Sequence, residues 1–147
     1  LSTVALALMP ATSIALNYGS QDLSDDTGAF DHAREIFDSV PDGSVVMSLD
    51  ERNAFALWYM RFVEDTDRDI ATVTVPLLQF DWYWEETHDR FPARLPPAPI
   101  GEQGDAVLAI AERNQGVARL FFTYWHPVLE ELFELTPVGP VFEATLR

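Results

Sequence analysis

The stretch of sequence that decides the fold is Ser44-Val-Val-Met-Ser-Leu49, followed directly by Asp50-Glu-Arg-Asn53. The first part is a short, mostly apolar run of strand length, which predicts a buried strand. The acidic and amide side chains that follow are typical of a helix N-terminus, where a side-chain oxygen caps free backbone N–H groups. The segment therefore predicts a strand that leads directly into a helix.

The rest of the chain alternates in the same way. The run Ile70–Leu78 begins Ile-Ala-Thr-Val-Thr-Val, and its β-branched residues predict a second strand. Strands separated by helices imply right-handed crossovers. The predicted fold class is therefore α/β, a three-layer sandwich with a mainly parallel, Rossmann-like sheet of about four strands. The two remaining strands are expected at Val117–Thr123 and Val141–Leu146, the last antiparallel at an edge after a short connection.

Aromatic residues are concentrated in two of the predicted helices. One set is spaced i, i+3, i+4, i+7 and i+8, which predicts a stripe facing the core; it consists of Phe55, Trp58, Tyr59, Phe62 and Val63. The consecutive residues Trp82, Tyr83 and Trp84 cannot all face one side of a helix. At least one of them is expected at the surface or under the proline-rich segment 91–104, and Trp82 and Tyr83 are candidates for stacking on a sugar ring.

Composition limits the classes of function. The chain has 147 residues and a net charge of −15, and it contains nine basic residues and no Cys. All nine basic residues are Arg. This charge makes nucleic acid an unexpected partner, because a binder must neutralise phosphates with a basic face. The absence of Cys excludes disulfides, thiolate metal sites and a cysteine nucleophile.

The N-terminal segment differs sharply from the rest, because the first charged residue is Asp22. We divide the chain into 1–16, the end of a membrane helix or an apolar lead-in, and 17–147, a single soluble domain. A helix of 16 residues reaches about 24 Å, short of the roughly 30 Å hydrocarbon core. The tail of a signal peptide and an ordinary buried segment are the other interpretations.

The residues Asp50, Glu51, Arg52 and Asn53 are the main candidate binding site. Ligands of open α/β sheets bind outside the carboxyl ends of strands, near helix N-termini. The alternative interpretation is plain helix capping by Asp50. No catalytic residue, metal site or cofactor is predicted. The Asp-x-Asp spacing in Asp65-Thr-Asp67-Arg-Asp69 can clamp a divalent cation, but it precedes a strand instead of following one, which favours a solvated turn.

The order of several motifs resembles a known family. The central motif is Asn53-Ala-Phe55-Ala-Leu57-Trp58-Tyr59, followed by Asp69-Ile70, a strand and Trp82-Tyr83. This order is similar to that of the protein O-mannosyltransferase-like polytopic membrane proteins with a glycosyltransferase-C-type core. Weaker matches in the same order are Asn17-Tyr18, Asp22-Leu23-Ser24, Arg119-Leu-Phe-Phe122 and Gly139-Pro-Val-Phe142.

The resemblance implies a function for the whole protein. In that family the catalytic acidic residue lies in the membrane core, so this chain would be a non-catalytic extracytoplasmic domain. It would cover the transfer site or hold the acceptor, and its partners would be its own membrane core and a glycan or polypeptide acceptor. Two other functions stay open: a free-standing module that binds a small ligand, and an independent enzyme with its site around Asp50.

Overall fold

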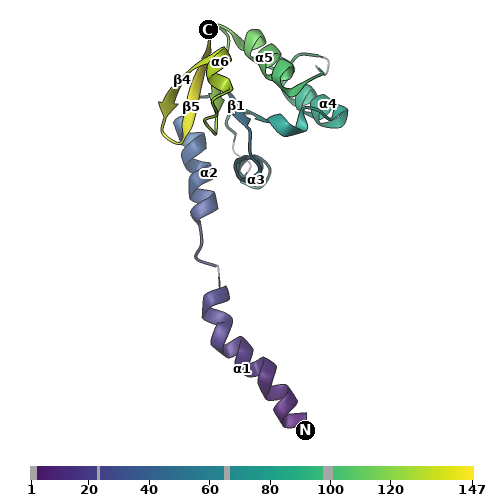
Figure 1. Ribbon diagram of the computed structural model, residues 1–147, viewed down its shortest axis with the longest axis vertical. Helices are drawn as coiled ribbons and strands as arrows, with labels where there is room; N and C mark the ends of the chain where they lie inside the picture. The colour runs from purple at the N-terminus through teal and green to yellow at the C-terminus, as the bar shows by residue number, and fades with distance from the viewer. Residues whose placement is uncertain (1–2, 23, 65–66, 98–100) are drawn as a thin grey trace.

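The computed structural model describes residues 3–22, 24–64, 67–97 and 101–147. Its elements alternate between helix and strand until a hairpin closes the chain (Figure 1). They are α1 (Thr3–Gln21), α2 (Gly28–Ser39), β1 (Val45–Ser48), α3 (Glu51–Phe62), β2 (Ala71–Thr74), the 3-10 turn η1 (Val75–Leu77), α4 (Asp81–Arg90), α5 (Gln103–Asn114), β3 (Leu120–Phe122), α6 (Leu129–Leu132), β4 (Phe133–Val138) and β5 (Val141–Leu146).

The described strands form one mixed sheet of five strands in the order β2-β1-β3-β5-β4. β1 pairs in parallel with β2 and with β3. β5 pairs antiparallel with β3 and with β4. The prediction of a mainly parallel, Rossmann-like sheet of about four strands is therefore wrong. The last strand is antiparallel as expected, but it lies inside the sheet, and β4 occupies the edge.

The C-terminal hairpin explains the mixed sheet. Only Gly139 and Pro140 separate β4 from β5, and a connection this short can join only antiparallel strands. Gly139 takes a φ of 57°, a left-handed conformation that glycine adopts without a steric penalty. Pro137 lies within β4, where an edge strand tolerates a residue without an N–H donor.

The sheet has a hydrophobic cluster on each face, and helices cover both. On one face α2 and α3 pack against Val46, Phe121 and Val141. On the other face α4, α5 and α6 pack against residues that include Met47 and Phe122. Alternating side chains of β1 therefore enter different clusters, as the pleat of a strand requires.

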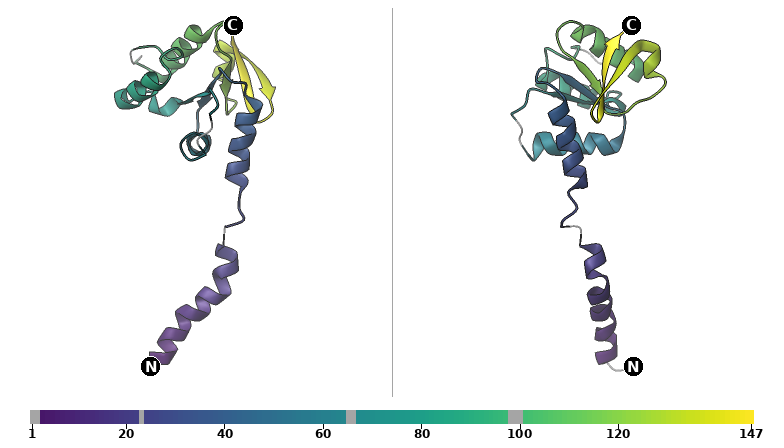
Figure 2. Two further views of the ribbon diagram at one scale, coloured as in Figure 1. Left: turned by 180° about the vertical axis from the view of Figure 1, so that it is seen from behind. Right: turned by 90° about the vertical axis from the view of Figure 1, so that its left-hand side faces the viewer.

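Helix α1 projects away from the globular part (Figures 1 and 2). Its residues from Leu8 to Gln21 are all exposed. The helix extends past the predicted boundary at 16 and includes Asn17 and Tyr18. Among the described residues, no helix combines the length and the apolar character needed to cross a membrane.

Helix α3 faces the sheet with a different side from the one predicted. Its buried residues are Asn53, Ala54, Leu57 and Met60. The expected core stripe is instead largely on the outside, and Phe55 is 61% exposed. Every position from Ala54 to Met60 is apolar or aromatic, so periodicity alone allows more than one buried face.

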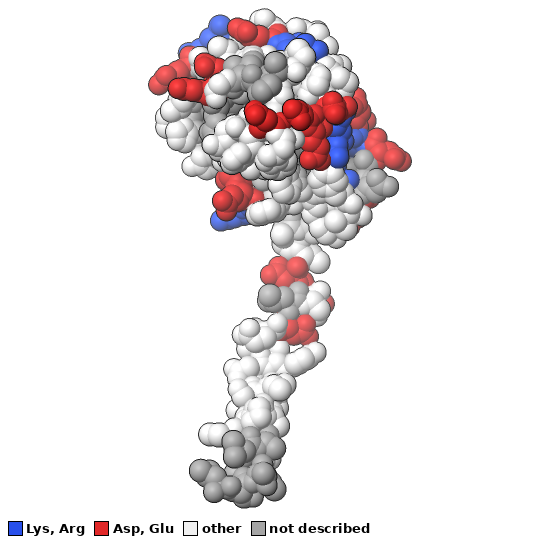
Figure 3. Space-filling model, turned by 90° about the vertical axis from the view of Figure 1, so that its right-hand side faces the viewer, with Lys and Arg blue, Asp and Glu red and all other residues white. Residues whose placement is uncertain are grey.

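Charge is unevenly distributed over the molecule. In the view of Figure 3 the described part of α1 is white, whereas the globular part carries many acidic groups and a few small basic ones. This agrees with the sequence, in which the first charged residue is Asp22.

Candidate functional site

The Asp50–Asn53 segment forms the N-terminus of α3 at the carboxyl end of β1. Asp50 Oδ1 accepts a hydrogen bond from the backbone N–H of Asn53 at 3.0 Å. Its other oxygen, Oδ2, accepts one from Asn53 Nδ2 at 2.6 Å. Ser48, the last residue of β1, donates its hydroxyl to the Asp50 carbonyl at 2.7 Å. The capping interpretation is therefore confirmed, and a binding role for these residues stays a prediction.

Asn53 links this cap to helix α2. It is only 8% exposed, and its Oδ1 lies 2.8 Å from His32 Nε2. Because Asn53 Nδ2 already donates to Asp50, its Oδ1 is the acceptor, and His32 Nε2 must carry the proton. This contact could not be expected from the sequence, since His32 and Asn53 are 21 positions apart.

Glu51 and Arg52 are both exposed. Arg52 lies at an apolar groove of about 460 Å³ between α2 and α3, which we call the α2–α3 groove. Its other lining residues are Asp26, Ala29, Phe30, Ala33, Phe55, Ala56 and Tyr59. Phe55 and Tyr59, which were predicted to face the core, are therefore exposed at this groove.

The rings at the α2–α3 groove are held in place by specific contacts. Phe30 and Tyr59 meet edge to face with ring centroids 6.0 Å apart. The Tyr59 hydroxyl donates to Glu64 at 3.0 Å, and this hydrogen bond raises the pKa of Tyr59. The Arg34 guanidinium carbon lies over the Phe30 ring, 4.4 Å from its centroid. These contacts preorganise an apolar surface that is open to solvent.

The three consecutive aromatic residues of α4 have different environments. Trp82 is 57% exposed and stacks on Phe80 with centroids 6.3 Å apart. Tyr83 is buried, and its hydroxyl accepts a hydrogen bond from the backbone N–H of Thr74 at 2.7 Å. Trp84 is buried and donates Nε1 to the Pro96 carbonyl at 3.2 Å, which fixes the proline-rich segment. Trp82 is thus the one free to stack on a ligand.

Trp82 and Tyr83 line a cleft of about 230 Å³ that we call the α3–α4 cleft. It lies beside the edge strand β2, between the C-terminal half of α3 and helix α4. The remaining lining residues are Trp58, Arg61, Phe62, Thr72, Glu86, Thr87, Arg90 and Phe91. Two of these lining residues, Trp82 and Tyr83, were predicted from the sequence, whereas Arg61 and Arg90 were not.

Two arginines and two phenylalanines cross-link the α3–α4 cleft. The Arg61 guanidinium carbon lies 4.4 Å from the Phe91 ring centroid. The Arg90 guanidinium carbon lies 4.7 Å from that of Phe62. Each helical segment thus supplies one cation and one ring, an arrangement in which each cation is attracted to a ring face.

Only part of the hydrogen-bonding capacity of the Arg61 guanidinium group is satisfied. Its Nη1 donates to the Ile70 carbonyl at 2.9 Å, while its buried Nε has no hydrogen-bond partner among the described residues. Burial lowers the pKa of Arg61, and the charges of Arg90 and Arg94 lower it further, whereas Asp69 opposes them. This corner therefore carries a concentration of positive charge within an acidic domain.

The Asp-x-Asp motif lies partly outside the described residues, because Asp65 and Thr66 are not described. Asp69, the last residue of the motif, forms an ion pair with Arg94. Arg68, which the sequence did not identify, donates to the Phe37 carbonyl at 2.5 Å, to the Val40 carbonyl at 2.7 Å and to Asp42 at 2.7 Å. It therefore satisfies carbonyls at the C-terminus of α2.

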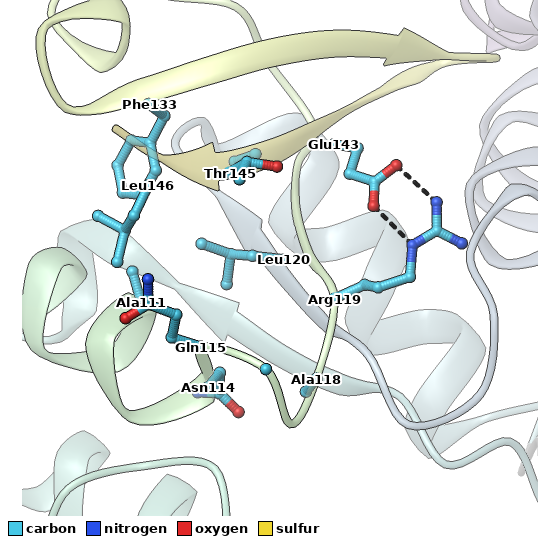
Figure 4. Close-up of a pocket in the computed structure, with 12 residues that line it drawn as sticks. Ala111, Asn114, Gln115, Ala118, Arg119, Leu120, Phe133, Glu143, Thr145 and Leu146 are labelled. Atoms are coloured by element: carbon cyan, nitrogen blue, oxygen red, sulfur yellow. Dashed lines mark hydrogen bonds and ion pairs between the residues drawn. The ribbon is translucent and has the colours of Figure 1, made fainter.

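Another hollow, of about 170 Å³, lies at the opposite end of the parallel strands, near the start of β3 (Figure 4). Arg119 Nε and Nη2 donate to Glu143 at 2.6 and 2.5 Å, so the pair is bidentate. These bonds raise the pKa of Arg119 and lower that of Glu143. The pair joins the start of β3 to β5. Because the two charges neutralise each other, little net charge is left to attract a ligand.

The fold and these surfaces define a small domain with a mixed sheet, helices on both faces and open clefts. Residues 29–102 match the family model described as TMEM260-associated domain 2. The chain belongs to this family. No curated protein and no solved structure matches the chain.

The family match covers the central motifs of the resemblance but not its four weaker matches, which lie outside residues 29–102. It spans Asn53–Tyr59 and Trp82-Tyr83, as well as both clefts except for the first residue of the α2–α3 groove, Asp26. The match links the domain to a membrane-protein family, which agrees with the broader part of the resemblance.

Proposed function

We propose that this chain is a non-catalytic extracytoplasmic domain of a membrane glycosyltransferase-like protein. The domain docks on the membrane-embedded part of that protein through the α2–α3 groove. There it covers the transfer site or holds the acceptor, while the membrane part transfers the sugar, which the resemblance suggests is mannose.

The observation that carries this proposal is the exposed apolar surface of α3. Phe55 is 61% exposed and Tyr59 is 43% exposed, and both line the α2–α3 groove from one helix. Large exposed apolar surfaces usually mark sites of protein or membrane contact. The family match supplies the class of partner, because it associates the domain with a membrane protein.

The position of α1 supports docking through the end of the domain where the α2–α3 groove lies. Figure 1 shows α1 leaving the globular part from the end where α2 begins and where α3 lies. The sequence of this helix contains no charged residue. An apolar helix and the aromatic groove at one end of the domain favour a single apolar partner on that side.

The docking is tested in the full-length protein by changing Phe55 and Tyr59 to Ser. We expect both variants to keep the folded domain, because exposed substitutions change stability by about 0.5 kcal/mol or less, and to lower sugar transfer. Val117, which is 79% exposed and outside the groove, gives the matched control V117S. Equal activity in the groove and control variants would refute the proposal.

The side of the membrane is tested by cysteine labelling. The chain contains no Cys, so one cysteine placed at Val117 in a full-length protein cleared of other cysteines is a single reporter. We expect a membrane-impermeant maleimide to label intact cells at this position. Labelling only after the membrane is permeabilised would place the domain on the cytoplasmic side and contradict the proposal.

A further inference from the structure

The α3–α4 cleft is a separate feature from the surface on which the proposed docking rests. None of its lining residues lines the α2–α3 groove. Either site can therefore fail without the other. Its arginines and aromatic rings give it a chemistry that docking does not use.

The cleft concentrates positive charge where the rest of the domain is acidic. The net charge of the chain is −15, yet two of its nine basic residues line this one cleft. Among the described residues that line the cleft, Glu86 is the only acidic one, and its oxygen lies 3.5 Å from Arg90 Nη2. That contact is at the limit of a hydrogen bond and is solvent-exposed, so it neutralises Arg90 weakly.

Arg61 supplies the other cation at the cleft. It is held by stacking on Phe91 and by its bond to Ile70, so little side-chain entropy is lost when it receives a ligand. Its Nε lacks a hydrogen-bond partner among the described residues. Arg guanidinium groups are well suited to phosphate and carboxylate groups because they present several donors in one plane.

The aromatic walls define the remainder of the ligand. Trp82 is more than half exposed, with Phe80 stacked on it, and Trp58 is half-buried across the cleft. Such faces bind flat apolar surfaces of rings. The Glu86 carboxylate accepts hydrogen bonds, which suits a ring that carries hydroxyl groups. The cleft is smaller than the roughly 300–1,000 Å³ of sites for drug-sized ligands, so it fits one ring.

We propose that the α3–α4 cleft binds an anionic sugar, meaning a single hexose-sized ring that carries a phosphate or carboxylate group. Arg90 and Arg61 hold the anion, Trp82 and Trp58 stack on the ring, and Glu86 accepts hydroxyl hydrogens. Neither the family match nor the docking proposal assigns this site.

The test is calorimetric titration of the full chain with glucose 6-phosphate, glucuronate, glucose and inorganic phosphate. We expect at least one of the two anionic sugars to bind with a dissociation constant of about 1 mM or below. Glucose and inorganic phosphate should each bind about tenfold more weakly, because each offers only half of the recognised chemistry. If neither anionic sugar binds, or if inorganic phosphate binds equally well, the proposal is overturned.

Two matched pairs of variants locate the binding. Arg90→Gln and Trp82→Ala should each weaken binding by about tenfold or more. Arg34→Gln removes an arginine stacked on a phenylalanine outside the cleft, and Trp125→Ala removes an exposed tryptophan outside it. Thermal unfolding confirms that all four variants fold. Binding that falls equally in the control variants, or in none of the four, would contradict the assignment to this cleft.

Discussion

Replacing Asp50 with Ala tests the two separate roles that the structure gives to its carboxylate. The first role is the cap on the Asn53 N–H, whose loss typically costs about 1 kcal/mol. The second is the bond from Asn53 Nδ2, which lies on a side chain that is 8% exposed. Leaving that donor without a partner costs about 1–2 kcal/mol. We therefore expect Asp50→Ala to lower the free energy of unfolding by about 2–3 kcal/mol.

Asp50→Ser separates these roles. A serine hydroxyl can cap the helix but offers no second oxygen to Asn53 Nδ2, so the expected loss is about 1–2 kcal/mol. Asp105→Ala is the control, because Asp105 is an exposed acidic residue in the first turn of α5. The expected loss there is below about 1 kcal/mol, since only the interaction with the helix dipole is removed.

The assay is urea unfolding followed by tryptophan fluorescence. All four tryptophans, at positions 58, 82, 84 and 125, lie in the globular part, so the signal does not report on α1. Free energies follow from linear extrapolation. The reasoning is refuted if Asp50→Ala loses no more than Asp105→Ala, or if Asp50→Ser loses as much as Asp50→Ala. In the full-length protein, Asp50→Ser should leave sugar transfer intact if Asp50 only caps the helix.

Three further predictions concern stability. Arg68→Met should cost about 1–3 kcal/mol in urea unfolding, because it leaves the Val40 carbonyl without its donor and the Phe37 carbonyl with only the 3.4 Å bond from the Val40 N–H; an unchanged midpoint would contradict this role. Gly139→Ala should lower the melting temperature, because the φ of 57° is strained for alanine and the new Cβ would lie 2.8 Å from Ser39 Oγ. Arg119 lowers the pKa of Glu143 from 4.5, so the contribution of this pair is fully present above about pH 4.5 and is lost as the pH falls through the lowered pKa. Glu143→Gln should therefore cost about 1 kcal/mol or less at pH 7 and nothing in strong acid, measured by unfolding at both pH values.

The sequence by itself determined the local elements. The strands at Val45–Ser48, Ala71–Thr74, Leu120–Phe122 and Val141–Leu146 fall inside the predicted segments, because their apolar and β-branched residues favour extended structure without reference to the rest of the chain. The cap at Asp50 was also predictable, since its hydrogen bonds join residues only three positions apart.

Only the tertiary structure decided how these elements pair and which sides they bury. The alternation of Phe133-Glu-Leu-Thr-Pro-Val became a strand because β5 offered an edge, where Pro137 loses no ladder bond. The outward face of α3 follows from packing Ala54, Leu57 and Met60 towards the sheet, a choice among apolar sides that periodicity leaves open. The α3–α4 cleft unites residues from α3, β2 and α4. Its arginines carried no local signal, because the stacks of Arg61 on Phe91 and Arg90 on Phe62 exist only after the chain has folded.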